Sequence, residues 1–219
     1  MARHNGWNGT FLYIDLSLKK TQQRPSMDMS SSFIGGRLMA SRLYWDMVGP
    51  QTKAHDPENV LMFMPGPLTG SGALACSRWI MAAKTTYLYP EQFGFANAGG
   101  FFGAAIKQAG FDGIIATGFS EKLSYVLIEN GAVQIKDAGG LQGLKIDETM
   151  KRLHEAHGQQ ARIVCIGPAG ESRVSFATAG TDQGGSLSNG MGAVMGSKNL
   201  KAVVIKATGR VAVADPAAL

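Results

Sequence analysis

Apolar and polar positions along this chain follow strand and helix periods in an order that occurs twice. In the first half, a strand over Thr10–Leu16 runs into a polar return over Ser17–Gln23, which indicates a hairpin or a bent strand pair. A helix over Phe33–Val48 follows, introduced by serines and stopped by a Gly-Pro pair. Further along, a second helix is expected over Phe102–Ala109, and short apolar runs predict buried strands at Val60–Met64, Trp79–Ala83 and Gly113–Thr117.

The second half repeats this order. A hairpin turns at Asn130-Gly131 between strands over Tyr125–Ile128 and Ala132–Lys136, and a helix over Ile146–His157 precedes a strand over Arg162–Ile166. The stretch Gly192–Val204 then aligns without gaps on Gly103–Ile115. The sequence therefore predicts an α+β fold made by duplication, with pseudo-two-fold symmetry and small sheets flanked by helices. The repeats are expected at about residues 9–118 and 123–209.

Glycine is unusually abundant, with 29 of the 219 residues, and it is clustered. Clustered glycine brings a backbone close either to another backbone or to a ligand. One glycine-rich stretch in each half leads into a helix, whose free N–H groups suit phosphate oxygens. Two such stretches across a pseudo-two-fold axis favour a ligand with two phosphate-bearing arms, whereas close helix packing is the alternative. The clusters are Gly66–Gly72, Gly94–Gly103, Gly167–Gly170 and Gly184–Gly196.

The charge and the cysteine content exclude several classes of protein. The net charge of +5 is spread along the chain, which fits a mildly basic surface or an anionic ligand and lacks the basic, aromatic-rich pattern of a nucleic-acid binder. The two cysteines, Cys76 and Cys165, form neither a disulfide scaffold nor the four ligands of an iron–sulfur cluster. No apolar run approaches the roughly 18 residues of a membrane span. Asp15 interrupts the first apolar stretch, so we expect a cytoplasmic protein without a secretory signal.

Most of the short motifs are weak. Gly190–Gly196 resembles a dinucleotide fingerprint, but no strand is predicted directly before it and no acidic residue follows at the required distance. His154 and His157 have a spacing that a metal could use, although a solvated helix surface is favoured there. No Gly-x-Ser-x-Gly elbow supports a hydrolase. Arg78 and Asn97 stand out as polar side chains among small residues, and Asn97 would also suit a turn.

Several motifs occur in an order that resembles the N-terminal domain of the aldehyde:ferredoxin oxidoreductase family, over about residues 1–215. The most specific are Gly66-Pro67-Leu68-Thr69-Gly70 and the run from Gly192 to Ala202, and Ala96-Asn97-Ala98-Gly99-Gly100 is another of these motifs. The resemblance implies a two-repeat base that holds tungsten, or molybdenum, between the dithiolenes of two pyranopterins, with a magnesium ion bridging the pterin phosphates.

The resemblance also assigns roles to particular residues. Arg78 matches an arginine that lies between the pterin and the iron–sulfur cluster. Asn97 matches an asparagine whose carbonyl reaches the magnesium ion, and Gly99 matches a glycine whose backbone contacts the cofactor. In the second loop the aldehyde-oxidising members have Arg-Gly where this chain has Ser188-Asn189, so one bidentate phosphate donor is missing. The remaining cofactor-binding candidates are Ser188, Asn189, Met191 and Gly192, with Asn97 and Asn189 at the metal.

Family members continue into C-terminal helical domains that carry the [4Fe–4S] cluster and the substrate channel, and these are absent from this chain. We therefore expect an inactive base with no catalytic residue of its own, which needs the missing domains or a partner subunit. In the whole enzyme, an aldehyde would be oxidised to a carboxylate with ferredoxin or another iron–sulfur carrier as acceptor. The resemblance leaves a homodimer open. The alternative is a stand-alone, non-catalytic scaffold for a pterin or another phosphate ligand.

Overall fold

A computed structural model of the chain describes residues 5–218. Two six-stranded mixed sheets form its framework, in the orders β2-β1-β6-β3-β4-β5 and β8-β7-β12-β9-β10-β11. The first half of the chain builds the first sheet and the second half builds the other.

The first half pairs a long hairpin with four further strands and three helices. Its elements are β1 (Thr10–Asp15), β2 (Lys20–Pro25), α1 (Met27–Phe33), α2 (Gly36–Met47), β3 (Leu61–Pro65), β4 (Trp79–Thr85), β5 (Gln92–Ala98), α3 (Phe102–Gln108) and β6 (Gly113–Thr117).

The second half has the same plan, although two of its strands have only three residues each. Its elements are β7 (Ser124–Glu129), β8 (Ala132–Asp137), a 3₁₀ turn at Gly139–Leu141, α4 (Ile146–His157), β9 (Arg162–Ile166), α5 (Pro168–Glu171), β10 (Ala179–Thr181), a 3₁₀ turn at Asp182–Gly184, β11 (Gly185–Leu187), α6 (Met191–Ser197) and β12 (Leu200–Lys206).

The strand order confirms the predicted duplication. Each sheet carries one parallel pair, β1 with β6 and β7 with β12, while every other neighbouring pair is antiparallel. The gapless alignment also holds locally. A left-handed residue, Gly110 after α3 and Asn199 after α6, separates each helix from the strand that follows it. The limits of the two repeats, at about 9–118 and 123–209, remain a prediction.

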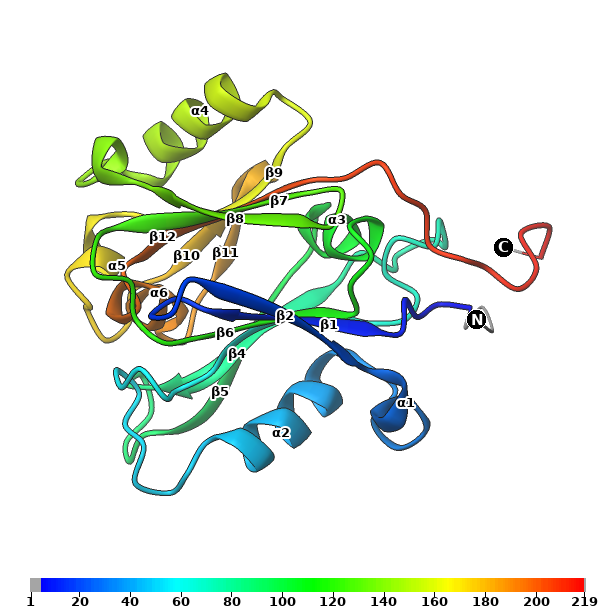
Figure 1. Ribbon diagram of the computed structural model, residues 1–219, viewed down its shortest axis with the longest axis horizontal. Coiled ribbons are helices and arrows are strands. Elements are labelled where there is room, and N and C mark those ends of the chain that lie inside the picture. The colour runs from blue at the N-terminus through cyan, green and yellow to red at the C-terminus, as the bar shows by residue number, and fades with distance from the viewer. Residues whose placement is uncertain (1–4, 219) are drawn as a thin grey trace.

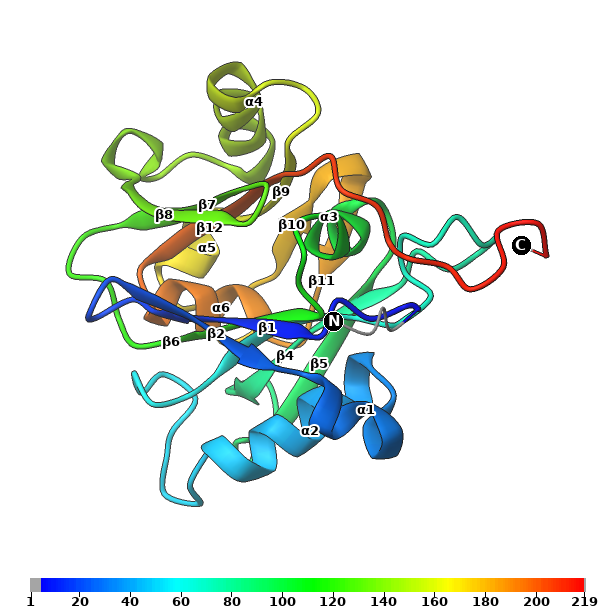
Figure 2. The ribbon, with the colours of Figure 1, turned by 45° about the vertical axis from the view of Figure 1, so that its right-hand side comes forward.

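The elements stack in five layers, with α3 and α6 in the middle (Figures 1 and 2). The central core draws on both halves, for example Phe63 and Phe102 from the first and Val164 and Met195 from the second. α2 covers the outer face of the first sheet and α4 the outer face of the second, each over its own apolar cluster. Within residues 5–218, no helix has the length and apolar character that a membrane crossing requires.

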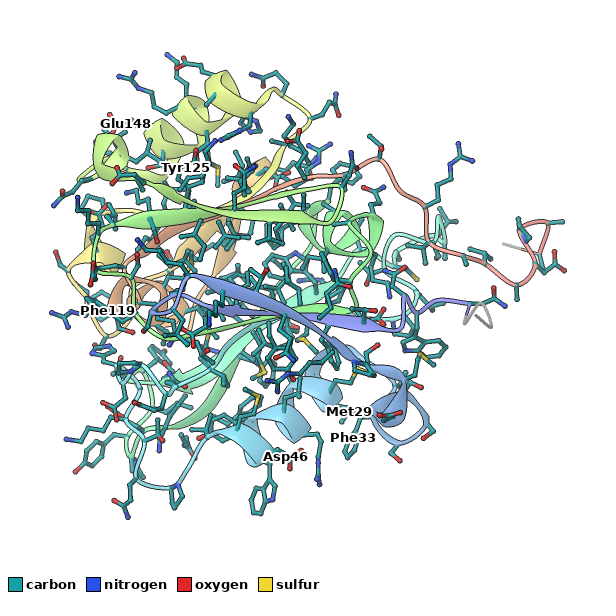
Figure 3. All side chains as sticks on the ribbon, viewed as in Figure 1. Met29, Phe33, Asp46, Phe119, Tyr125 and Glu148 are labelled. Carbon is teal, nitrogen blue, oxygen red and sulfur yellow. The ribbon has the colours of Figure 1, made fainter. Side chains whose placement is uncertain are left out.

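Two sequence-based expectations about local structure are wrong. The helix expected over Phe33–Val48 is α2, which begins only at Gly36, and a separate helix that was not predicted, α1, ends at Phe33. The chain breaks between them because Ile34 has a positive φ of 54° and Gly35 packs against Pro67, where a Cβ would lie 2.9 Å from the proline ring. Met29 and Phe33 of α1 pack against the cluster under α2 (Figure 3). The glycine-rich stretches Gly94–Gly103 and Gly184–Gly196 are not plain loops either, since the first contains most of β5 and the second contains β11. Backbone pairing holds such strands whatever their side chains are, so they need no regular apolar alternation that a sequence pattern could reveal.

Candidate functional site

The two sheets approach one another at their edges, where β5 lies against β11. Each of these edge strands leads through a short glycine-containing loop into an inner helix. Residues 99–101 join β5 to α3, and residues 188–190 join β11 to α6. The pseudo-two-fold arrangement thus brings the two predicted cofactor loops to one region of the molecule.

Arg78 stands directly before β4, beside the first of these loops. Trp79 pairs with Ala98, and the Trp79 indole Nε1 donates to the Gly99 carbonyl at 3.2 Å, so Arg78 lies next to Gly99. The Thr69 hydroxyl holds the backbone there, because it donates to the Arg78 carbonyl at 3.0 Å and accepts from the Gly66 N–H at 3.1 Å. The Gly66–Gly70 motif therefore fixes the position of Arg78, whose own side chain is exposed.

Asn97 lies on β5 rather than in a turn, and it is exposed. Its neighbour across the sheet is Ile80, so its side chain shares a face with Phe95 and with Arg78. The Phe95 carbonyl accepts a hydrogen bond from Asn189 Nδ2 at 2.7 Å and therefore points away from β4, across the free edge. Alternate residues of a strand direct their carbonyls to the same side, so the Asn97 carbonyl faces that edge as well. This places an oxygen donor at the junction of the two sheets.

The second loop is built on two left-handed residues, Asn189 at a φ of 55° and Gly190 at 72°. A Cβ on Gly190 would lie 2.5 Å from the Ser175 carbonyl oxygen, so only glycine fits there. The Asn189 carbonyl accepts from the Thr85 hydroxyl at 2.6 Å, and its second lone pair is left for another donor or a cation. Ser188, where the resemblance expects arginine, is exposed.

The last two predicted residues lie inside the protein. Met191 and Gly192 are fully buried at the start of α6, where a Cβ on Gly192 would lie 2.4 Å from the Thr178 carbonyl oxygen. Their position favours packing, the alternative interpretation of these glycines. A short strand, β11, does precede Gly190, contrary to the sequence-based expectation. Within its sheet β11 pairs with β10 in antiparallel fashion, and a dinucleotide site requires a parallel crossover.

The histidine pair on α4 serves the fold. The Tyr125 hydroxyl and His157 Nε2 are 3.1 Å apart, and Tyr125 reaches from β7 to α4 (Figure 3). His154 Nδ1 lies 3.3 Å from the Gly158 carbonyl at the helix end. Burial lowers the pKa of His157. In the part of the chain that the structure describes, no three His, Cys, Asp or Glu side chains gather as a metal site would require.

Each loop is braced by the opposite repeat, which sequence reasoning missed. The 188–190 loop is held by Thr85 and Phe95 of the first half. The 99–101 loop faces Asp182 and Gln183, because a Cβ on Gly100 would lie 3.2 Å from Gln183 Oε1 and 3.7 Å from the Asp182 carbonyl oxygen. The Arg162 guanidinium lies 4.9 Å from the centre of the Phe101 ring. The only signal in the sequence is a charged residue, Asp182, within a run of small ones.

A family model described as the aldehyde ferredoxin oxidoreductase N-terminal domain matches residues 11–207. Among curated proteins, a tungsten-containing aldehyde ferredoxin oxidoreductase of Thermococcus kodakarensis is 37% identical over 97% of this chain and 35% of its own length. The WOR-like subunit of an aliphatic sulfonate oxidoreductase of Pyrococcus furiosus is 33% identical over 93% of this chain and 35% of its own length.

The fold has a close counterpart among solved structures. A chain in the active site complex BamBC of benzoyl coenzyme A reductase, bound to 1,5-dienoyl-CoA, superposes with a TM-score of 0.91 at 34% identity. The match covers 97% of this chain and 32% of the other. The chain thus spans about a third of the length of the relatives it matches.

Proposed function

The chain belongs to the aldehyde ferredoxin oxidoreductase family, and on that premise we propose that it binds a tungsten, or molybdenum, bis-pyranopterin for an oxidoreductase. One observation carries the proposal: the two glycine-containing loops flank the junction where β5 lies against β11, and a ligand with two similar arms could reach both from there. When bound, such a centre supplies oxygen-atom transfer and two-electron chemistry, and the protein supplies binding and orientation.

The residues at the junction fit this group in their donor chemistry. Arg78 offers an exposed planar guanidinium for a phosphate or a pterin edge. The Asn97 carbonyl, which faces the sheet edge, and the free lone pair of the Asn189 carbonyl are oxygen donors of the kind that magnesium prefers. Gly99 lets the backbone approach, and Ser188 adds one hydroxyl. Met191 and Gly192 are buried, so they would not contact the cofactor and would instead support the 188–190 loop by fixing the start of α6.

The whole enzyme's reaction is a further part of this proposal. We infer oxidation of an aldehyde to a carboxylate with ferredoxin as acceptor. A [4Fe–4S] cluster and a substrate channel would be supplied by regions outside this chain. The relatives act on aldehydes, on aliphatic sulfonates and on a benzoyl-CoA system, so the substrate class is the least constrained element. The rival function is a non-catalytic carrier of the same ligand, which would hold a pterin but transfer no electrons.

Substitution of Arg78 in the complete enzyme tests the binding role. A charge-assisted hydrogen bond is worth about 1.5–3 kcal/mol, so Arg78→Ala should weaken cofactor retention roughly 10- to 150-fold. The measurement is tungsten, molybdenum and magnesium per protein after gel filtration, with thermal melting as a check on folding. Asn97→Ala keeps the backbone carbonyl that would bind magnesium, so its magnesium content should stay near that of wild type. Loss of magnesium in this variant would show that the side chain is the ligand instead.

Arg152→Ala, an exposed arginine on the outer helix α4, is the matched control and should keep wild-type metal content. Wild-type metal in folded Arg78→Ala protein would overturn the role of Arg78. Aldehyde-dependent reduction of ferredoxin by the loaded wild-type protein separates the enzyme from the carrier, since a carrier would bind the cofactor without turnover.

A further inference from the structure

Asp182 is a buried residue whose carboxylate has one oxygen without a hydrogen-bond partner among the described residues. It lies in the turn between β10 and β11, and its side chain is only 6% exposed. Its Oδ2 is 3.5 Å from Arg162 Nη1, while its Oδ1 has no hydrogen-bond partner among the described residues. Burial raises the pKa of Asp182, and the nearby Arg162 opposes that rise. Arg162 is the ion-pair partner of this carboxylate, so removal of the arginine would leave a buried charge without its counter-charge.

The same Arg162 side chain reaches into the first repeat. Its guanidinium lies 4.9 Å from the ring centre of Phe101, the residue directly before α3. Phe101 is half exposed and ends the 99–101 loop. Gly100 in that loop has a φ of 79°, and a Cβ there would lie 3.2 Å from Gln183 Oε1 and 3.7 Å from the Asp182 carbonyl oxygen. In Figure 2, the start of α3 lies beside β10 and β11.

We propose that Arg162 and Asp182 are a positioning pair, which fixes the 99–101 loop of the cofactor site from the opposite repeat by stacking Arg162 on Phe101. An arginine can do this because its planar guanidinium stacks with one face and bonds through its edge. Asp182 contacts the edge of the Arg162 guanidinium and so fixes its orientation, while the flat face of the guanidinium stacks on the Phe101 ring. Neither residue needs to touch the ligand. The proposal rests on the proposed function only in naming this loop as part of the cofactor site.

The test reads the loop directly in the purified chain, without any cofactor. Hydrogen–deuterium exchange of a peptide spanning residues 97–103 reports loop opening. Loss of a partly exposed cation–π contact corresponds to a change of roughly 3- to 30-fold in an opening equilibrium. Phe101→Leu removes the stacking partner and leaves the ion pair intact, so it should speed exchange by that factor with an unchanged melting temperature. Arg152→Gln is the control and should exchange like wild type.

A paired substitution separates positioning from stability. Arg162→Gln leaves the Asp182 carboxylate without its partner and should lower stability as well as loosen the loop. In Arg162→Gln/Asp182→Asn no bare charge remains, so stability should recover while loop exchange stays fast. If the pair had a merely structural role, the double variant would recover both its stability and its slow loop exchange, and that result would overturn the proposal. Wild-type loop exchange in Phe101→Leu would also overturn it.

The same variants distinguish this proposal from the proposed function. If loop exchange rises in Phe101→Leu but the complete wild-type enzyme holds no metal, the positioning pair stands and the cofactor assignment fails. If wild type holds metal and loop exchange is unchanged in Phe101→Leu, the cofactor assignment stands and the positioning pair fails.

Discussion

At the scale of single residues, the most unusual environment is that of Lys198 at the end of α6. The side chain is fully buried, and its Nζ donates to the carbonyls of Pro57 at 3.2 Å and Gly118 at 3.3 Å. Both acceptors are neutral, so the ammonium loses its hydration without gaining a carboxylate partner. Burial therefore lowers the pKa of Lys198 to about 8, even though Glu58 and Asp15 act in the opposite direction.

This lysine makes stability depend on pH. Its pKa is about 8 when folded and about 10.4 in an unfolded chain, so between these values the unfolded state binds more protons. The free energy of unfolding should therefore rise with pH across that window, by about 3 kcal/mol if the full difference is realised. Urea denaturation at pH 7.5 and pH 10 measures it.

Lys198→Met is the comparison, because it keeps the length of the side chain and cannot titrate. All other groups titrate alike in the two proteins, so the difference between their pH slopes isolates Lys198. Equal slopes would contradict the lowered pKa of this lysine in the folded chain.

At the scale of elements, the contact between α5 and α6 is made backbone to backbone. A Cβ on Gly196 would lie 1.8 Å from the Gly170 carbonyl oxygen, which no side-chain movement can relieve. Gly196→Ala should therefore force the helices apart and cost about 3 kcal/mol or more of unfolding free energy. Gly140→Ala is the control, since a Cβ there meets nothing within 4 Å and the change should stay within about 0.5 kcal/mol. Urea denaturation of both variants measures the free energy of unfolding. An equally small loss in both would show that the α5–α6 contact is not tightly packed at Gly196.

The elements that the sequence predicts well are those with a strong apolar signal. β6, α4 and β9 have the predicted bounds, because their apolar runs or helical stripes are ended by glycine or a turn. β10 and β11 escape prediction because each has only three residues, most of them small, so no apolar pattern marks them. β5 escapes because glycine and small residues occupy the face opposite Phe93 and Phe95. The Thr85 contact to Asn189 spans 104 residues, so no local signal could announce it.

The candidate site shows the same division. Arg78 and Asn97 could be singled out because each is a polar side chain among small ones, and the structure brings both to one sheet face. Met191 and Gly192 belong to an equally distinctive motif, yet they are buried. A motif alone cannot separate a glycine that meets a ligand from one that meets a neighbouring backbone. Only the three-dimensional arrangement reveals the bracing by Arg162 and Asp182.

At the scale of the whole molecule, the thiols limit which metal centres the chain can carry alone. Cys165 lies inside β9, fully buried, and burial raises its pKa to about 12, so it stays protonated. That leaves Cys76, and a [4Fe–4S] cluster needs four thiolates. Reconstitution of the purified chain with iron and sulfide should give no stoichiometric iron by elemental analysis. Iron bound at the monomer's elution volume, and retained in Cys76→Ala, would contradict this prediction.

The two repeats share a core, and this should govern how the chain unfolds. The central cluster holds Leu12 and Phe63 together with Val164 and Val203, so separation of the halves would expose apolar faces on both. The crosswise bracing of the two loops adds polar contacts at the same boundary. Neither repeat can keep its inner face dry alone, and the cost of exposing it couples their unfolding.

We therefore expect a single calorimetric transition for the 219-residue chain. At about 0.7 kcal/mol per residue the enthalpy near 60 °C would be roughly 150 kcal/mol, and the van't Hoff enthalpy should equal it. Two independently folding repeats would instead give a van't Hoff value near half the calorimetric one. Such a ratio, or two resolved peaks, would mean that the shared core and the crossed loops do not hold the repeats together. The site at their junction could then open without unfolding either half.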